Sequence, residues 1–158
     1  KVYKNTLVRF AAADLNLEIG DLLTGPTAIA FVPTDGTGDP VAVAKVLKDY
    51  DYRVLEAETG VQALKVWEAN QGKVDLLLTD MVMPGGIGGA ELAQQLRKCK
   101  SDLRVIYSSG YSTEVGGKSL TENDPTFLAK PYRPPQLALR VRKSLDNPPL
   151  PILELATA

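Results

Sequence analysis

The residue of this chain best placed to do chemistry is Asp80, which follows an apolar run. Residues 74–80 read Val-Asp-Leu-Leu-Leu-Thr-Asp, and Pro84 and Gly85 come shortly afterwards. Such a run is typical of a strand buried in a parallel sheet. In open α/β sheets, ligands and reacting groups collect at the carboxyl ends of the strands. Asp80 is therefore a candidate nucleophile or metal ligand, although a loop-capping role would explain this residue alone equally well.

Two later apolar runs also end in polar residues. Residues 104–108 lead into Ser109, and residues 126–129 lead into Lys130. Helix-length segments separate the three runs, so we expect parallel strands whose carboxyl ends share one edge of a sheet. An acid, a hydroxyl and a lysine are predicted to meet at that edge, which favours a chemical role for Asp80.

These motifs resemble those of response-regulator receiver domains, specifically receivers attached to hybrid sensor kinases. The matching motifs are Thr-Asp-Met-Val-Met-Pro at 79–84, Ser-Gly-Tyr at 109–111 and Lys-Pro-Tyr at 130–132, and the resemblance covers residues 41–146. It implies a phosphoacceptor module of two-component signalling, with at most its own phosphorylation and dephosphorylation as enzymatic activity. The implied partner is a histidine kinase or phosphotransfer protein, because this chain contains no histidine of its own.

The resemblance also implies roles for individual residues at the site. Asp80 would accept the phosphoryl group, and Lys130 would pair with that group as a point charge. Ser109 would donate a hydrogen bond to a phosphoryl oxygen, with Ser108 as the less favoured alternative. Phe127 occupies the position of the family's rotating aromatic switch, although a buried core phenylalanine explains it at least as well.

Magnesium is the cofactor that the resemblance implies, bound by Asp80 and by the backbone carbonyl of Val82. Receivers also hold the ion with a pair of acidic residues at the end of their first strand, and the sequence departs from the family there. The nearest acids are Asp39 and Asp35. For these two residues a helix N-cap and an Asp-Gly turn are favoured over metal ligation. We therefore expect weak magnesium binding and a weakened phosphoacceptor.

Residues 1–50 resemble a different family, the large-subunit ribosomal protein (number ten) at the base of the stalk. The most specific motif is Gly-Pro-Thr-Ala-Ile-Ala-Phe at residues 25–31. Residues 27–32 are expected to form a strand, and Asp39-Pro40 to open a helix over 40–49. This strand and helix can serve as the first strand and first helix of the receiver.

The alternation of strands and helices predicts an α/β, flavodoxin-like doubly wound parallel sheet of order 2-1-3-4-5, with residues 27–32 as strand one. We expect one domain over residues 1–146, in which 1–50 is ribosomal-protein-like and 51–146 receiver-like, followed by a tail over 147–158. The remaining expected elements are an extra N-terminal strand and helix segment (2–4, 5–11 and 17–23), strands at 53–57, 74–79, 104–108 and 126–129, and helices after Thr59, at 91–98, at 118–122 and after Pro135.

Composition favours a cytoplasmic protein that does not enter a membrane. The net charge is −1, there is a single cysteine, and no apolar run approaches the roughly 20 residues that span a bilayer. Two alternative functions stay open. One is an artificial or recombined chimera with no selected function, favoured by the abrupt change of family near residue 50. The other is a fragment that binds ribosomal RNA, disfavoured because basic and aromatic residues are not clustered.

Overall fold

A five-stranded parallel sheet forms the centre of the computed structural model, which describes residues 27–31, 40–83, 85–110, 114–115, 118–119 and 124–150. The strand order is β2-β1-β3-β4-β7, with β7 as the fifth strand of the sheet. The predicted flavodoxin-like order 2-1-3-4-5 is therefore confirmed. The five strands are β1 (Thr27–Phe31), β2 (Arg53–Ala57), β3 (Leu76–Asp80), β4 (Arg104–Ser109) and β7 (Phe127–Ala129).

Strand β1 lies between β2 and β3 and pairs with both in parallel. Ala28 is opposite Val54 on one side and opposite Leu76 on the other. The backbone of β1 therefore joins β2 to the strands that carry the candidate site. Residues 27–31 belong to the ribosomal-protein-like segment, and they supply the strand that a receiver sheet needs at this position.

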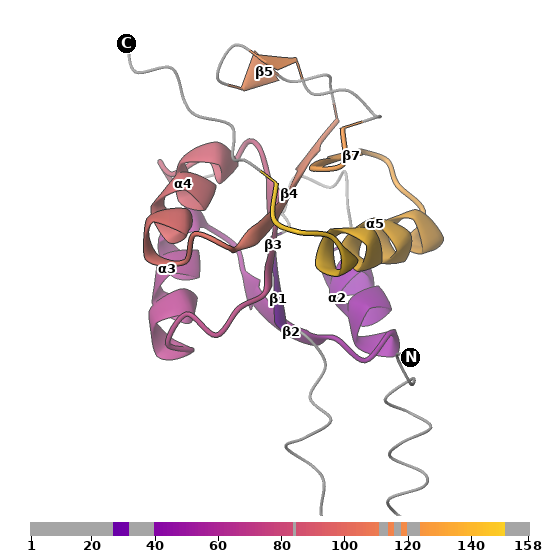
Figure 1. Cartoon of the computed structure of the whole chain (residues 1–158), viewed down its shortest axis with the longest axis horizontal. Coiled ribbons are helices and arrows are strands. Elements are labelled where there is room, and N and C mark those ends of the chain that lie inside the picture. Colours follow the sequence, from indigo (N-terminus) through magenta and orange to yellow (C-terminus); the bar gives the residue numbers. More distant parts are fainter. Residues whose placement is uncertain are drawn as a thin grey trace, which may run out of the picture.

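Among the described elements, two helices cover each face of the sheet (Figure 1). Helices α3 (Gly60–Ala69) and α4 (Gly89–Cys99) lie on one face, and α2 (Pro40–Asp49) and α5 (Pro134–Asp146) lie on the other. Successive side chains of a strand point to opposite faces, so Leu77 packs in the core under α3 and α4 while Leu76 packs under α2 and α5. Both leucines are fully buried, which explains the uninterrupted apolar run before Asp80.

The helix after β2 begins as its sequence predicts. Thr59 is the N-cap of α3, and its hydroxyl oxygen accepts a hydrogen bond of 3.1 Å from the backbone N–H of Gln62. Within the described ranges, no helix combines the length and the apolar character that crossing a bilayer requires.

The short helix expected over 118–122 is wrong where the structure describes it. Lys118–Ser119 form strand β6, which pairs antiparallel with β5 (Glu114–Val115). The sequence between the two strands is Gly-Gly, which favours a two-residue hairpin turn over a helix. Residues 120–122 lie outside the described part, as do the expected strand and helices of residues 1–26, residue 32 and the tail after 150.

One core side chain carries a buried hydroxyl with no hydrogen-bond partner. Tyr107 on β4 is 1% exposed, and its hydroxyl contacts no donor or acceptor within the described residues. Burial raises the pKa of Tyr107 to about 12, while the positive charge of Arg97 acts in the opposite direction. A buried polar group without a partner costs about 1–3 kcal/mol, so this hydroxyl destabilises the folded chain.

We expect Tyr107→Phe to raise the free energy of unfolding by about 1 kcal/mol at pH 7, because the ring stays and the unpartnered hydroxyl is removed. Above pH 10 the hydroxyl ionises more easily in the unfolded chain, whose pKa is lower, so the wild type loses stability as pH rises. The advantage of the variant should therefore widen by about 1.4 kcal/mol at pH 11. Urea unfolding at both pH values measures this difference, and a variant less stable than wild type at pH 7 would contradict it.

Candidate functional site

The acid and the lysine singled out in the sequence form a buried ion pair. Lys130 Nζ donates a hydrogen bond of 2.8 Å to Asp80 Oδ2. The side chains of Lys130 and Asp80 are 6% and 8% exposed, respectively. Asp80 is the last residue of β3, and Lys130 directly follows β7 on the other side of β4. Little water screens the pair, so the attraction between the two charges is strong.

The end of strand β4 holds these two strands together through its backbone. Ser108 lies opposite Asp80 in the sheet, and its carbonyl accepts a 3.0 Å hydrogen bond from the N–H of Met81. The carbonyl of Ser109 accepts a 2.8 Å hydrogen bond from the N–H of Lys130. The structure therefore brings the predicted acid, hydroxyl and lysine to one edge of the sheet.

Two serines, Ser108 and Ser109, lie at this edge of the sheet. The Ser108 hydroxyl donates a hydrogen bond of 3.2 Å to the carbonyl of Leu128, so its proton is committed to the neighbouring strand. Ser109 is the last residue of β4 and is 9% exposed. The role of Ser109 as the contact for a group bound at Asp80 stays a prediction.

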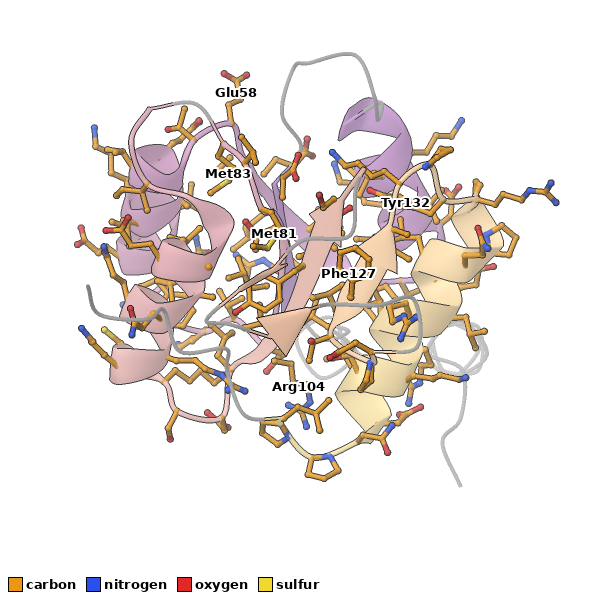
Figure 2. All side chains as sticks on the ribbon, turned by 90° about the horizontal axis from the view of Figure 1, so that it is seen from above. Glu58, Met81, Met83, Arg104, Phe127 and Tyr132 are labelled. Carbon is orange, nitrogen blue, oxygen red and sulfur yellow. The ribbon has the colours of Figure 1, made fainter. Side chains whose placement is uncertain are left out.

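Tyr132 is a neighbour of the site that the sequence interpretation did not single out. The side chain of Tyr132 is partly buried, and burial is the main reason why its pKa is raised. A hydrogen bond with the Ser108 side chain lowers the pKa, and the charge of Asp80 raises it. Figure 2 shows Tyr132 and Met83 toward the end of the sheet opposite Arg104. The signal for Tyr132 was present in the Lys-Pro-Tyr motif, but its contact with Ser108 depends on packing across strands.

The glycine-rich loop after Asp80 lets helix α4 approach the site closely. A Cβ atom at Gly89 would lie 2.0 Å from the carbonyl oxygen of Asp80, which no side chain could tolerate. Gly85 and Gly86 have φ angles of +91° and +93°, a conformation that L side chains rarely adopt. The Thr79 hydroxyl also donates to the Asp80 carbonyl, at 3.1 Å. These contacts fix the backbone that carries the acid.

Two further predicted site residues lie in contrasting environments. Val82, two residues after Asp80, has a side chain that is 78% exposed. Phe127 is 2% exposed and packs in the core under α3 and α4. Its burial agrees with the core interpretation, and its role as a switch stays a prediction.

The described residues do not complete a magnesium site. Asp80 and the Val82 carbonyl are the groups that would hold the ion, whereas magnesium requires six oxygen ligands in octahedral geometry. Across residues 40–83, 85–110 and 124–150, no three acidic, cysteine or histidine side chains gather closely enough to hold a metal. Asp35 and Asp39 lie outside the described residues, so their part in metal binding stays a prediction.

Comparison with known proteins identifies the family of this arrangement. Residues 41–142 match the response regulator receiver domain family. The chain belongs to this family. It is 32% identical over 138 residues to the sensor kinase CckA of Brucella abortus, an alignment that covers 87% of this chain and 14% of CckA. The crystal structure of the receiver domain from hybrid histidine kinase CckA superimposes with a TM-score of 0.61 at 34% identity, covering 75% of this chain and 98% of that domain.

The amino-terminal third matches a second family, ribosomal protein L10, over residues 1–51. Large ribosomal subunit protein uL10 of Bacillus cereus is 37% identical over 98 residues, covering 53% of this chain and 57% of that protein. Both predicted resemblances are therefore confirmed. The two family matches overlap at residues 41–51, which contain most of helix α2 and the turn that follows it.

We expect Lys130→Met to lower the free energy of unfolding by about 3–5 kcal/mol, because it leaves the Asp80 carboxylate buried without a counter-charge. The double variant Asp80→Asn/Lys130→Met should lose less than Lys130→Met alone, because neither charge remains. Urea unfolding of the wild type, both single variants and the double variant gives the coupling energy. A loss below about 1 kcal/mol for Lys130→Met would show that the pair behaves as an exposed ion pair.

Proposed function

We propose that this chain is a phosphoacceptor of two-component signalling and that Asp80 is the residue that becomes phosphorylated. Membership of the receiver family supports the phosphoacceptor role in general. The observation that carries the assignment to Asp80 is the buried hydrogen bond of 2.8 Å from Lys130. Lys130 occupies Oδ2, while Oδ1 has no hydrogen bond within the part of the chain that the structure describes. Oδ1 is therefore the oxygen available for attack.

In the proposed reaction, the donor is a phosphohistidine of another protein, since this chain contains no histidine. Asp80 Oδ1 forms a bond to phosphorus while the phosphorus–nitrogen bond to the donor imidazole breaks. The leaving nitrogen takes up a proton, and Asp80 becomes an aspartyl phosphate. Phosphoryl transfer is catalysed mainly by positioning and by neutralising charge on the phosphoryl oxygens. Lys130 is placed to supply that charge, and Ser109 to donate a hydrogen bond.

We further propose that this phosphoacceptor is weak. Magnesium, when bound, neutralises phosphoryl oxygens in this chemistry. The described residues offer it the Asp80 carboxylate and the Val82 carbonyl, and the sequence at the end of strand one lacks the family's acidic pair. Lys130 then remains as the main positive charge at Asp80. We expect magnesium-dependent phosphorylation of Asp80 that is slow, because the ion would be bound weakly.

The match to ribosomal protein L10 supports a second possibility, an RNA-binding fragment. The described part of that match consists of β1 and α2, and both belong to the receiver sheet and its covering layer. We propose instead that the chain arose by joining pieces of two families, because the two matches meet at a helix that each family contains. This origin retains Asp80, Ser109 and Lys130 and accounts for the missing acidic pair.

Exposure of the purified chain to acetyl phosphate tests the proposed function. We expect one phosphoryl group on the wild type, located at Asp80 by peptide mass spectrometry, and none on Asp80→Asn. Omitting magnesium should slow the reaction further, because the ion, when bound, neutralises charge on the phosphoryl oxygens. Ser109→Ala should slow the reaction about 10-fold or more, because it removes a hydrogen bond to a charged group.

Ser108→Ala is the matched control in the same experiment, since the Ser108 hydroxyl donates to Leu128. It should leave the rate near that of the wild type. Absence of any label on the wild type, or a label that persists in Asp80→Asn, would refute the assignment. A larger effect of Ser108→Ala than of Ser109→Ala would exchange the roles of the two serines.

A further inference from the structure

A separate pocket lies at the end of strand β4 remote from Asp80. Its volume is about 360 Å³, and it is bordered by helix α4, strand β4, helix α5 and the segment after α5. Arg104, the first residue of β4, lines it, and Figure 2 shows Arg104 at the end of the sheet opposite Tyr132. Ligand pockets in proteins commonly have volumes of about 300–1,000 Å³, so the space suits a small molecule.

The polar side of this pocket is strongly basic. Arg97 from α4, Arg104 from β4, and Arg140 and Lys143 from α5 all line it, and none of its described lining residues is acidic. Burial lowers the pKa of Arg97, and Tyr107 and Asp102 act in the opposite direction; Asp102 does not line the pocket.

The guanidinium groups of Arg97 and Arg104 are held in place by neutral partners. Arg97 Nε donates to the carbonyl of Leu103 at 2.6 Å, and Arg104 Nε donates to the carbonyl of Asn147 at 3.2 Å. A carbonyl orients a guanidinium without neutralising it, and each guanidinium has five N–H donors. Both residues therefore keep charge and donors for a further partner.

The unpartnered hydroxyl of Tyr107 belongs to the same place. Tyr107 and Arg97 both line the pocket, and the positive charge of Arg97 lowers the pKa of Tyr107 against the larger effect of burial. A tyrosine hydroxyl is protonated at neutral pH, so it can serve as a donor. An acceptor at the inner end of the pocket would supply the hydrogen bond that the described residues do not.

The remaining wall of the pocket is apolar and closed by the start of the tail. Val105, Pro148 and Leu150 contribute it. The tail is anchored there, because Arg104 donates to the Asn147 carbonyl and the Asn147 side chain donates to the Lys143 carbonyl at 2.6 Å. Basic donors thus face an apolar wall across one small space.

We propose that this pocket binds a small phosphate monoester with an apolar body. The phosphate group would accept hydrogen bonds from Arg97, Arg104 and Tyr107, with Lys143 adding charge. Guanidinium groups match the geometry of phosphate oxygens, and several positive charges match a dianion better than a monoanion. The apolar body would lie against Val105 and the tail. The site is independent of phosphorylation at Asp80.

Titration of the full-length, isotope-labelled chain with phenyl phosphate, followed by NMR, tests this site. We expect saturable shifts at the Nε–Hε groups of Arg97 and Arg104 and at backbone amides of 104–107 and 143–147. Asp80→Asn should show the same shifts, which separates this binding from the phosphoacceptor. Inorganic phosphate and phenol should each bind at least about 10-fold more weakly than phenyl phosphate, because each lacks one of the two recognised parts.

Two variants and a matched control locate the binding. Arg104→Gln should raise the dissociation constant for phenyl phosphate about 10-fold or more, and Tyr107→Phe severalfold, in chains whose amide spectra show an unchanged fold. Arg53→Gln removes the same charge from strand β2, where Arg53 donates to the side chain of Asn70 at 3.1 Å and does not line the pocket. It should bind like the wild type.

Four results would overturn the proposal. Two concern the wild type: the absence of saturable shifts, and binding of phenol as tight as that of phenyl phosphate. The other two concern variants: a dissociation constant for phenyl phosphate raised as much by Arg53→Gln as by Arg104→Gln, and loss of the shifts in Asp80→Asn. Tight binding of phenol would show an apolar pocket that does not recognise phosphate. The other three results would show that no specific anion site exists at this pocket.

Discussion

The pairing of β1 with both β2 and β3 is the constraint on which the rest of this structure depends. Strands β3, β4 and β7 carry Asp80, the two serines and Lys130, and without β1 the edge of β3 would be left open. A parallel sheet is stable only when both faces are covered, and α2, the next described element after β1, covers one of them together with α5. The segment from the ribosomal-protein-like part thus completes both the sheet and one of its layers.

The buried ion pair links this sheet to its chemistry. A buried pair of charges adds little stability compared with well-packed apolar residues, and it is costly when one partner is lost. Its presence at the carboxyl edge of the sheet is therefore better explained by function than by stability. Asp80 is the last residue of β3 and Lys130 directly follows β7, on the other side of β4, so their contact depends on the strand order β3-β4-β7.

Most of the fold could be predicted from the sequence because its elements have strong local signals. The apolar pattern predicts strand β2, and the preference of threonine for helix N-caps predicts the role of Thr59. The contact between Asp80 and Lys130 is predicted because the carboxyl ends of parallel strands lie at one edge of the sheet. The contact of Gly89 with the Asp80 backbone and the unpartnered hydroxyl of Tyr107 could not be predicted, because they depend on how distant segments pack. The same holds for the basic pocket, which four separate segments line.

Native-state hydrogen exchange of the β1 backbone amides tests whether β1 is part of the folded sheet. We expect the amides of Ala28, Ile29 and Ala30 to exchange as slowly as that of Leu77 on β3, because a strand bonded on both sides opens only when the sheet unfolds. Exchange of these three amides at the rate of an unprotected chain, while Leu77 remains protected, would contradict it. Such a result would mean that the receiver sheet forms without the amino-terminal strand.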